Sequence, residues 1–379
     1  MKNKITFLLL HLGYGGIESA TINTANALSD LYDVELVSLY HLRDNQEALI
    51  NKNVKVIHLY GGQPNRNEFI DACKNKNVFR MLKEGARAII ILFNKKTKLI
   101  KFIRHCDSKV IVSTRHDISQ YLSKFKRKNV VAIAQEHRYH NNDKKYINVL
   151  KHKYNNINYI FALTESLKKF YEEILINNKK INILTIPNMV EISKKESKLN
   201  TNNVISIGRL HPDKRVNELV NIISKTKNVE KFYVIGDGSE LDNIKQLVNK
   251  MKLTSKVVIL GYRNKIEIEK YLLNSSIFLM ASITEGLPMV LLESMSMGIP
   301  CIAYDIECGV KDIIDNNENG FIIENRNEKE FVNLIDELLV DKEKLKKIGH
   351  NAKMKSLLFS KEQITKKWEE VLNKYLERK

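Results

Sequence analysis

The sequence predicts an α/β protein of two doubly wound domains, and three observations support that prediction. Short apolar runs alternate with amphipathic stretches, which is the pattern of a parallel sheet with crossover helices. The alternation occurs in two series, separated by the polar, lysine-rich residues 188–202. The chain has 379 residues, more than one hydrophobic core usually accommodates. We therefore expect domains at 1–187 and 203–360, joined by a linker at 188–202.

The apolar runs are the expected strands. The N-terminal series is "ITFLLL", "VELVSLY", "VKVIHLY", "KVIVST", "VVAIAQ" and "YIFALT". The C-terminal series is "NVISIG", "FYVIGDG", "KVVILG", "IFLMAS", "PCIAYD" and "GFIIE". All five prolines fall at inferred loops or helix starts, which agrees with this segmentation. Ligands of doubly wound sheets bind beyond the carboxyl ends of the strands, so we expect the functional residues there, in a cleft between the two domains.

Composition limits the class of protein. Hydrophobic residues make up 43% of the chain and charged residues 28%, as in a globular protein. The four cysteines show neither metal-ligand spacing nor a disulfide framework, so we expect packing thiols in a reducing compartment. The N-terminal apolar run is too short for a signal peptide. The run "AIIILF" at 88–93 is far shorter than the roughly 20 residues that span a bilayer. We expect a cytoplasmic location.

The formal net charge of +18 requires a partner: nucleic acid, an anionic membrane or a phosphate-bearing substrate. Much of this charge lies between residues 74 and 104, where one acidic residue, Glu84, accompanies ten basic ones: Lys74, Lys76, Arg80, Lys83, Arg87, Lys95, Lys96, Lys98, Lys101 and Arg104. Apolar side chains are interleaved with them. Such a basic amphipathic segment lies on an anionic membrane surface, or else it is the solvated helix face of a lysine-rich chain.

Residues 284–300, "TEGLPMVLLESMSMGIP", place two glutamates eight positions apart in an apolar run. Pro288 and Gly298 predict a helix from about 288 to 297, whose first amides favour a phosphate. Glu293 lies inside this helix, where we expect it to be buried and to need a hydrogen-bonding partner. That partner is either the vicinal diol of a ligand or a lysine. Glu285 precedes the helix and either caps it or holds sugar hydroxyls.

Two further motifs follow expected strands and suit phosphate groups. "GYGG" contains Gly15 and Gly16, which form either a tight turn or a loop whose amides approach an anion. "RLHPDKR" places Arg209 and Lys214 on either side of Pro212. The guanidinium and the ammonium can jointly neutralise a diphosphate, or both can be solvated surface groups.

Two other motifs also follow expected strands. "VIGDGSELDNI" contains Gly236, which suits either a glycine turn or the close approach of a nucleotide. "AIAQEHRYH" places Glu136 and His137 beyond a strand, and His137 is either structural or an active-site residue. His116, in "VSTRHD", is the alternative candidate for an active-site histidine.

Taken together, the motifs resemble the nucleotide-sugar-dependent glycosyltransferases of family 4, which have the GT-B fold of two Rossmann-like domains facing a central cleft. The matching segments are "GYGGIE", "SIGRLHPDKR", "VIGDGSELDNIKQL", "VVILGY", "FLMASITEGLPMVLLESMSMGIPCIAYD" and "CGVKDIIDNNENGFII". The sequence departs from the family's pattern at Val310 and Lys311. Many relatives have a proline followed by a variable residue at these two positions.

The resemblance implies a role for each matching residue. His137, Glu285, Arg209 and Lys214 would form the catalytic group. Glu285 would hold the transferred sugar, and Glu293 would hold the ribose hydroxyls. The full donor-binding set would be Gly15, Gly16, Arg209, Lys214, Gly236, Tyr262, Glu285, Gly286, Leu287, Met289, Val290 and Glu293. The family retains anomeric configuration and uses no metal or other cofactor, so none is expected. The final helix, within 361–379 and around Trp368, would pack back on the N-terminal domain.

We therefore expect a retaining hexosyltransferase. Its donor would be a nucleotide sugar, UDP-linked, and its acceptor a cell-envelope glycan, capsule, teichoic acid or lipid-linked sugar. Residues 74–104 would attach it to the inner face of the cell membrane. The alternatives are an epimerase or phosphorylase of the same fold, a nucleic-acid binder and an inactive partner subunit. We expect no nucleic-acid partner, because the charge is concentrated in one stretch and the strand-end motifs suit a small ligand.

Overall fold

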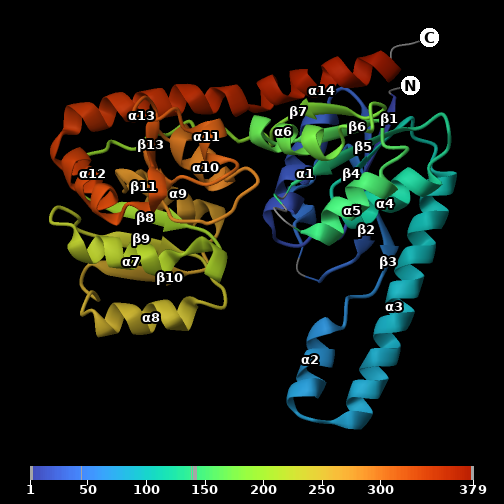
Figure 1. The fold of residues 1–379 in the computed structure, drawn as a ribbon, viewed down its shortest axis with the longest axis horizontal. Helices are drawn as coiled ribbons and strands as arrows, with labels where there is room; N and C mark the ends of the chain where they lie inside the picture. Colours follow the sequence, from blue (N-terminus) through green and yellow to red (C-terminus); the bar gives the residue numbers. More distant parts are fainter. Residues whose placement is uncertain (1–2, 44, 138, 140–142, 377–379) are drawn as a thin grey trace. The chain divides into compact units, whose positions relative to one another are not determined.

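The computed structural model describes residues 3–43, 45–137, 139 and 143–376, which form two compact units (Figure 1). The N-terminal unit comprises Met1–Leu163, Lys168–Ile186 and Thr365–Lys379, and the C-terminal unit comprises Thr164–Leu167 and Pro187–Ile364. Each contains one parallel sheet flanked by helices, so the predicted α/β class with doubly wound sheets is confirmed.

The sheet of the N-terminal unit has seven parallel strands in the order β3-β2-β1-β4-β5-β6-β7. Its strands are β1 (Lys4–Leu9), β2 (Asp33–Tyr40), β3 (Val54–Tyr60), β4 (Val110–Ser113), β5 (Val131–Glu136), β6 (Tyr159–Ala162) and β7 (Asn182–Thr185). The inner strands are buried on both faces, which is why they are nearly continuous apolar runs in the sequence. Strand β7 was not predicted, because this short edge strand is only half-buried.

The helices of the N-terminal unit follow the strands in the chain. They are α1 (Gly16–Leu28), the 3₁₀ turn η1 (Glu47–Leu49), α2 (Arg66–Lys74), α3 (Val78–His105), α4 (His116–Phe125), α5 (Lys144–Lys153), α6 (Glu165–Ile174) from Lys168 onward and α14 (Lys361–Leu376) from Thr365 onward. Trp368 of α14 is fully buried, with its ring centroid 4.8 Å from that of Phe161 and 5.7 Å from that of Phe7. The end of α14 is therefore part of the core of this unit.

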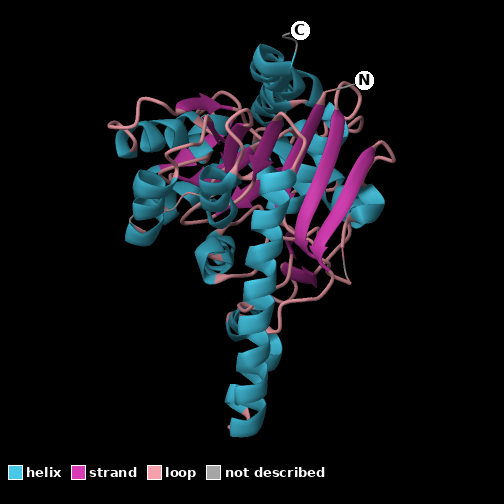
Figure 2. Cartoon of the chain, turned by 90° about the vertical axis from the view of Figure 1, so that its right-hand side faces the viewer, coloured by secondary structure: helices cyan, strands magenta, loops and turns pink. Residues whose placement is uncertain are grey.

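Helices α2 and α3 form a hairpin that projects from the sheet of the N-terminal unit (Figures 1 and 2). The inner side of the hairpin is polar as well as apolar: Asn65 donates a hydrogen bond of 2.8 Å to the buried Glu84, and Arg80 pairs with Asp71 at 2.7 Å. The outer side of α3 exposes seven large apolar side chains, each more than half exposed: Val78, Phe79, Leu82, Ile89, Ile90, Leu92 and Phe93. No helix in the described ranges combines the length and the apolar character needed to cross a membrane.

The sheet of the C-terminal unit has six parallel strands in the order β10-β9-β8-β11-β12-β13. Its strands are β8 (Val204–Ile207), β9 (Phe232–Ile235), β10 (Val257–Gly261), β11 (Ile277–Met280), β12 (Cys301–Tyr304) and β13 (Gly320–Ile323). The helices are η2 (Pro212–Lys214), α7 (Val216–Lys225), α8 (Leu241–Lys250), α9 (Lys265–Leu273), α10 (Met289–Ser296), α11 (Val310–Ile313), η3 (Glu324–Arg326), α12 (Glu328–Val340), α13 (Lys342–Ser356) and η4 (Leu357–Phe359).

Residues 188–202 pack within the C-terminal unit. Leu199 is buried there, and the Ser197 amide donates a hydrogen bond of 2.9 Å to the Met297 carbonyl. Three of the four cysteines are buried, in keeping with packing thiols, but Cys73 in the hairpin is exposed.

Candidate functional site

In the C-terminal unit, the predicted basic pair and Glu285 follow two adjacent strands at the point where the winding of the sheet reverses. Arg209 and Lys214 follow β8, and Glu285 follows β11, which is hydrogen-bonded to β8 although β9 and β10 lie between them in sequence. Such a reversal leaves a crevice at the carboxyl ends of the strands, where doubly wound sheets bind ligands. The structure therefore brings these sequence-predicted residues to one edge.

Lys214 and Glu285 are in direct contact. Lys214 Nζ lies 2.6 Å from Glu285 Oε1, and both side chains are less than a fifth exposed. Glu285 Oε1 also accepts a hydrogen bond of 2.8 Å from Ser282, and the Ile283 amide donates one of 2.9 Å to the Asp213 carbonyl. This half-buried, hydrogen-bonded ion pair fixes both charged groups in one place.

The loop that carries Arg209 is shaped by contacts between main-chain atoms. The Leu210 amide donates a hydrogen bond of 2.8 Å to the Asp237 carbonyl. Gly236 has φ +142°, and a Cβ there would lie 1.8 Å from the Gly208 carbonyl oxygen. Gly236 is thus required by the protein's own backbone, and its amide already donates to the Gly261 carbonyl. Arg209 itself is exposed, as is Tyr262, which follows β10.

Helix α10 begins at Met289, with Pro288 as its N-cap, and ends before Gly298, which has φ +73°. The first amides of a helix have no intrahelical partners, so those of Met289 and Val290 are available to an anion. Gly286 and these two residues are half-buried, and Leu287 is buried.

The expectation that Glu293 is buried was wrong. Its neighbours Leu292 and Ser294 are buried, but the Glu293 side chain is exposed. Desolvation by surrounding atoms raises the pKa of Glu293 to about 7, and Lys265 opposes this. Because the exposed carboxylate is in contact with water, it keeps much of its hydration. Glu293 therefore needs no structural partner and is accessible to a ligand.

Two residues that sequence reasoning missed support this site. Gly309, with φ +95°, lies beside the Gly286 loop: a Cβ on it would lie 3.0 Å from the Gly286 carbonyl oxygen. Arg326 donates hydrogen bonds to the carbonyls of Ala281 (2.8 Å) and Ser282 (3.4 Å), and it pairs with Glu218 at 2.6 Å. Arg326 thereby holds the segment that leads from β11 to Glu285. A lone arginine among polar residues gives no sequence signal of such a role.

In the N-terminal unit, the glycine loop follows β1 at the corresponding reversal between β1 and β4. Gly15 is the N-cap of α1, and Gly16 is its first residue. A Cβ on Gly16 would meet no atom within 4 Å, so the space beside it is open to a ligand. The buried Glu18 lies 3.4 Å from His11 within the same loop and helix start, a pair that the sequence analysis missed.

Glu136 ends β5, His137 follows it, and both residues are buried. Glu136 is 2% exposed and accepts hydrogen bonds from the Tyr154 hydroxyl (2.5 Å) and Ser119 (3.3 Å). Burial lowers the pKa of His137 to about 4, so the ring is neutral at pH 7. Its Nε2 atom is buried and has no hydrogen-bond partner within the described ranges. His116 begins α4 and packs edge-to-face on Tyr146, with 5.2 Å between ring centroids.

Glu136 is expected to make the stability of the N-terminal unit depend on pH. Burial raises its pKa to about 7, from an ordinary value of 4.5, although Tyr154 and Ser119 lower it. The folded state therefore holds the proton more tightly than the unfolded chain, so stability is fully present below about pH 4.5 and falls as the pH rises through 7. Glu136→Gln should remove at most about 3 kcal/mol of this dependence. Urea unfolding at pH 5 and pH 8 measures the free energy of unfolding of the wild type and of Glu136→Gln. The same change with pH in both proteins would contradict the prediction.

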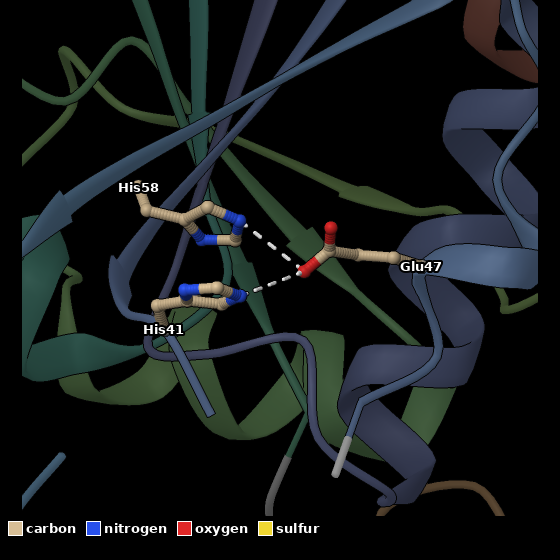
Figure 3. Close-up of side chains that lie close together, drawn as sticks. All are labelled: His41, Glu47 and His58. Carbon is tan, nitrogen blue, oxygen red and sulfur yellow. Dashed lines mark ion pairs between the residues drawn. The ribbon is translucent and has the colours of Figure 1, made fainter. Parts of the chain in front are cut away.

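Within the described ranges, one group of three side chains is arranged to hold a metal ion: His41, Glu47 and His58 in the N-terminal unit (Figure 3). It includes none of the predicted donor-binding or catalytic residues.

Comparison with known proteins shows which proteins this chain resembles. Residues 189–355 match the family model of glycosyl transferases group 1. An uncharacterized glycosyltransferase of Haemophilus influenzae is 26% identical over 379 residues, covering 97% of this chain and 99% of that protein. A poly(ribitol-phosphate) alpha-N-acetylglucosaminyltransferase of Staphylococcus aureus is 30% identical over 224 residues, covering 58% of this chain and 44% of that protein.

Among solved structures, a variant of TarM from S. aureus in complex with Fondaparinux, alpha-GlcNAc-glycerol and UDP superposes with a TM-score of 0.77. The identity is 19%, and the match covers 98% of this chain and 100% of that one. At this identity the likeness establishes the fold alone, which is GT-B, as the sequence analysis predicted. The family model and the relatives together support a glycosyltransferase.

Proposed function

We propose that this glycosyltransferase is a retaining enzyme of family 4 that moves a hexosyl residue from a UDP-linked sugar to a cell-envelope acceptor. The observation that supports this most directly is the contact between Lys214 and Glu285 where the winding of the C-terminal sheet reverses. Glu285 lies shortly before Met289, whose amide is among the first in α10. The S. aureus relative acts on poly(ribitol-phosphate), and the TarM structure contains UDP, which favour a teichoic-acid-like acceptor and a UDP donor for this chain.

The proposed donor site assigns one part of the nucleotide sugar to each group. Arg209, Lys214 and the amides of Leu287, Met289 and Val290 bind the diphosphate, because cations and helix amides both favour phosphate oxygens. The exposed Glu293 accepts hydrogen bonds from the ribose diol, and Glu285 accepts them from the sugar. Gly16 lies beside open space that a phosphate oxygen can enter.

In the transfer step, the bond between the anomeric carbon and the diphosphate oxygen breaks as the acceptor hydroxyl oxygen bonds to the same carbon, and the hydroxyl proton passes to the departing diphosphate oxygen. Positive charge grows on the sugar and negative charge on the leaving diphosphate. Lys214 and Arg209 stabilise the leaving group, so no metal is needed there. His137 stays neutral, so its role is to hydrogen-bond a sugar hydroxyl rather than to act as a cationic acid.

Screening nucleotide sugars tests this function. A donor present at 100 times its dissociation constant should stabilise the protein by about 2.7 kcal/mol, visible as a raised Tm. UDP-hexoses should give the largest shift, and nucleotide release should require an acceptor and persist without added Mg²⁺ or Mn²⁺. An equal shift with every nucleotide, or no shift with any of them, would contradict the assignment. Conversion of the donor without any sugar acceptor would indicate an epimerase or phosphorylase of the same fold.

We also propose that the α2–α3 hairpin attaches the enzyme to an anionic membrane. The exposed apolar residues 79, 82, 86, 89 and 93 recur at intervals of three and four, so they share one face of α3, and lysines and arginines flank it. An exposed apolar stripe bordered by cations suits the interface of an anionic bilayer. An acceptor anchored in that bilayer would then meet the enzyme at its surface.

Vesicle sedimentation tests the attachment. The wild type should bind phosphatidylglycerol vesicles more tightly than phosphatidylcholine vesicles, and added salt should weaken binding. The double variant Phe79→Ser/Leu82→Ser should bind at least tenfold more weakly, because each buried side chain contributes about 1.5–3 kcal/mol. Ile266→Ser, which removes a comparably exposed side chain from α9, is the matched control. A double variant that binds vesicles normally but changes oligomeric state would assign the stripe to a second copy instead.

A further inference from the structure

We propose that His41, Glu47 and His58 form a binding site for a divalent transition-metal ion of the Zn²⁺ class. His58 Nε2 lies 3.2 Å from Glu47 Oε1, and His41 Nε2 lies 3.8 Å from the same oxygen. All three ligand atoms lie within 4.8 Å of one another. In a tetrahedral zinc site with bonds of about 2.0–2.1 Å, neighbouring ligand atoms are about 3.3 Å apart. The three atoms are therefore close to the spacing that such an ion requires.

The local fold places these side chains. His41 follows β2, His58 lies near the end of the adjacent strand β3, and Glu47 begins the turn η1 between them. The two imidazole rings are stacked, with centroids 4.2 Å apart and planes at 21°, and both Nε2 atoms point at one oxygen of Glu47 (Figure 3). That oxygen is buried and accepts no hydrogen bond within the described ranges.

The hydrogen bonds of Ser38 determine the tautomer of His58. The Ser38 hydroxyl donates its hydrogen to the Tyr40 carbonyl at 3.0 Å, because a carbonyl can only accept. The Ser38 oxygen, 2.6 Å from His58 Nδ1, must then accept from the Nδ1–H group. Neutral His58 consequently presents the lone pair of Nε2 to the carboxylate of Glu47. A nitrogen lone pair and a carboxylate oxygen that face each other require a cation between them, and a hydrogen bond from Nδ1 is the usual support of a metal-binding histidine.

The geometry favours a metal ion over a simple ion pair, because two imidazole nitrogens converge on one oxygen of Glu47. Imidazole nitrogen with one carboxylate suits Zn²⁺ better than Mg²⁺ or Ca²⁺, which prefer oxygen alone. Half of the His41 side chain is exposed, so water or a ligand oxygen can complete the coordination.

The same turn also holds the glycine loop. Gln46, which precedes Glu47, donates hydrogen bonds of 2.8 Å to the carbonyls of Leu12 (from its amide) and Gly13 (from Nε2), and it accepts one of 2.8 Å from Ser19. An ion bound at Glu47 would therefore order the loop that carries Gly15 and Gly16. If the proposed donor site is right, this metal acts on donor binding through the position of the loop and takes no part in bond cleavage.

Calorimetric titration of Zn²⁺ tests the site independently of sugar transfer. The protein should be untagged, treated with EDTA and dialysed, in a Cys73→Ser background that removes the exposed thiol. We expect one Zn²⁺ per chain, a raised Tm, and reduced hydrogen exchange at residues 11–19, 41–43 and 45–49. Glu47→Gln, which preserves shape, should weaken binding at least tenfold. Loading with Co²⁺ should give the visible absorption of a tetrahedral or five-coordinate ion.

The matched control is His105→Asn, which removes an exposed histidine from α3 and should leave zinc binding unchanged. Circular dichroism of each variant verifies that it is folded. Absence of binding in the wild type, or equal affinity in the wild type and Glu47→Gln, would overturn the metal site and leave an ion pair. Neither result would affect the glycosyltransferase assignment, because no step of this test uses a donor or an acceptor.

Discussion

Replacing Lys214 by Met is expected to lower kcat for sugar transfer by roughly 10²–10³-fold. The ammonium is held 2.6 Å from Glu285, less than a fifth exposed, at the place proposed for the leaving diphosphate. Removing it takes away the charge proposed to stabilise the transition state, and Glu285 keeps its hydrogen bond from Ser282. Initial rates over a range of donor concentrations separate the loss of kcat from any change in KM.

Two variants make this measurement specific. Lys214→Arg keeps the positive charge and should recover part of the rate. Lys245→Met removes an exposed lysine from α8 and should leave the rate unchanged. The two glutamates of the proposed donor site should have different effects. Glu293→Ala should weaken donor binding, whereas Glu285→Ala should lower kcat more than affinity. Equal effects of the two glutamate variants would show that this division of roles is wrong.

Replacing Trp368 by Ala is expected to destabilise the N-terminal unit by about 3–5 kcal/mol. The side chain is fully buried against Phe7 and Phe161, so its removal leaves a large cavity where the end of α14 meets the sheet. Urea unfolding followed by far-UV circular dichroism measures the loss, since the variant lacks the chain's one tryptophan.

Trp368→Phe provides the control for packing. The indole Nε1–H has no hydrogen-bond partner within the described ranges, so phenylalanine removes a polar group that gains nothing from burial while it keeps most of the ring contacts. Its cost should be well below that of alanine. Similar costs for both variants would mean that the contacts with Phe7 and Phe161 contribute little.

The sequence predicted most of the fold because the inner strands are buried on both faces and so consist of uninterrupted apolar residues. It missed β7, "NILT", because a half-buried edge strand of four residues has no such pattern. The motifs of the proposed donor site were recognised because they follow strands, and their role in donor binding stays a prediction. The error at Glu293 arose because apolar neighbours in sequence suggested burial, whereas a helix can turn one carboxylate to solvent between buried side chains.

Other features depend on contacts that local sequence does not encode. Glu84 is a single acid within a basic run, and only the fold shows that it is buried beneath Asn65. His41, Glu47 and His58 follow no regular spacing, and the pairing of β2 with β3 brings them together. Arg326 reaches Ala281 across the chain from 45 residues away.

The close approach of Gly236 to the Gly208 carbonyl means that the shape of this loop and the choice of ligand depend on different residues. Because the loop around Arg209 is shaped by main-chain atoms, its outline does not depend on which side chains surround it. In the proposed donor site, substitutions at the exposed Tyr262, or at the accessible rim around Glu293, would then change which base or sugar is accepted without displacing Arg209. A new donor preference could therefore evolve, or be engineered, in small steps that each preserve a working enzyme.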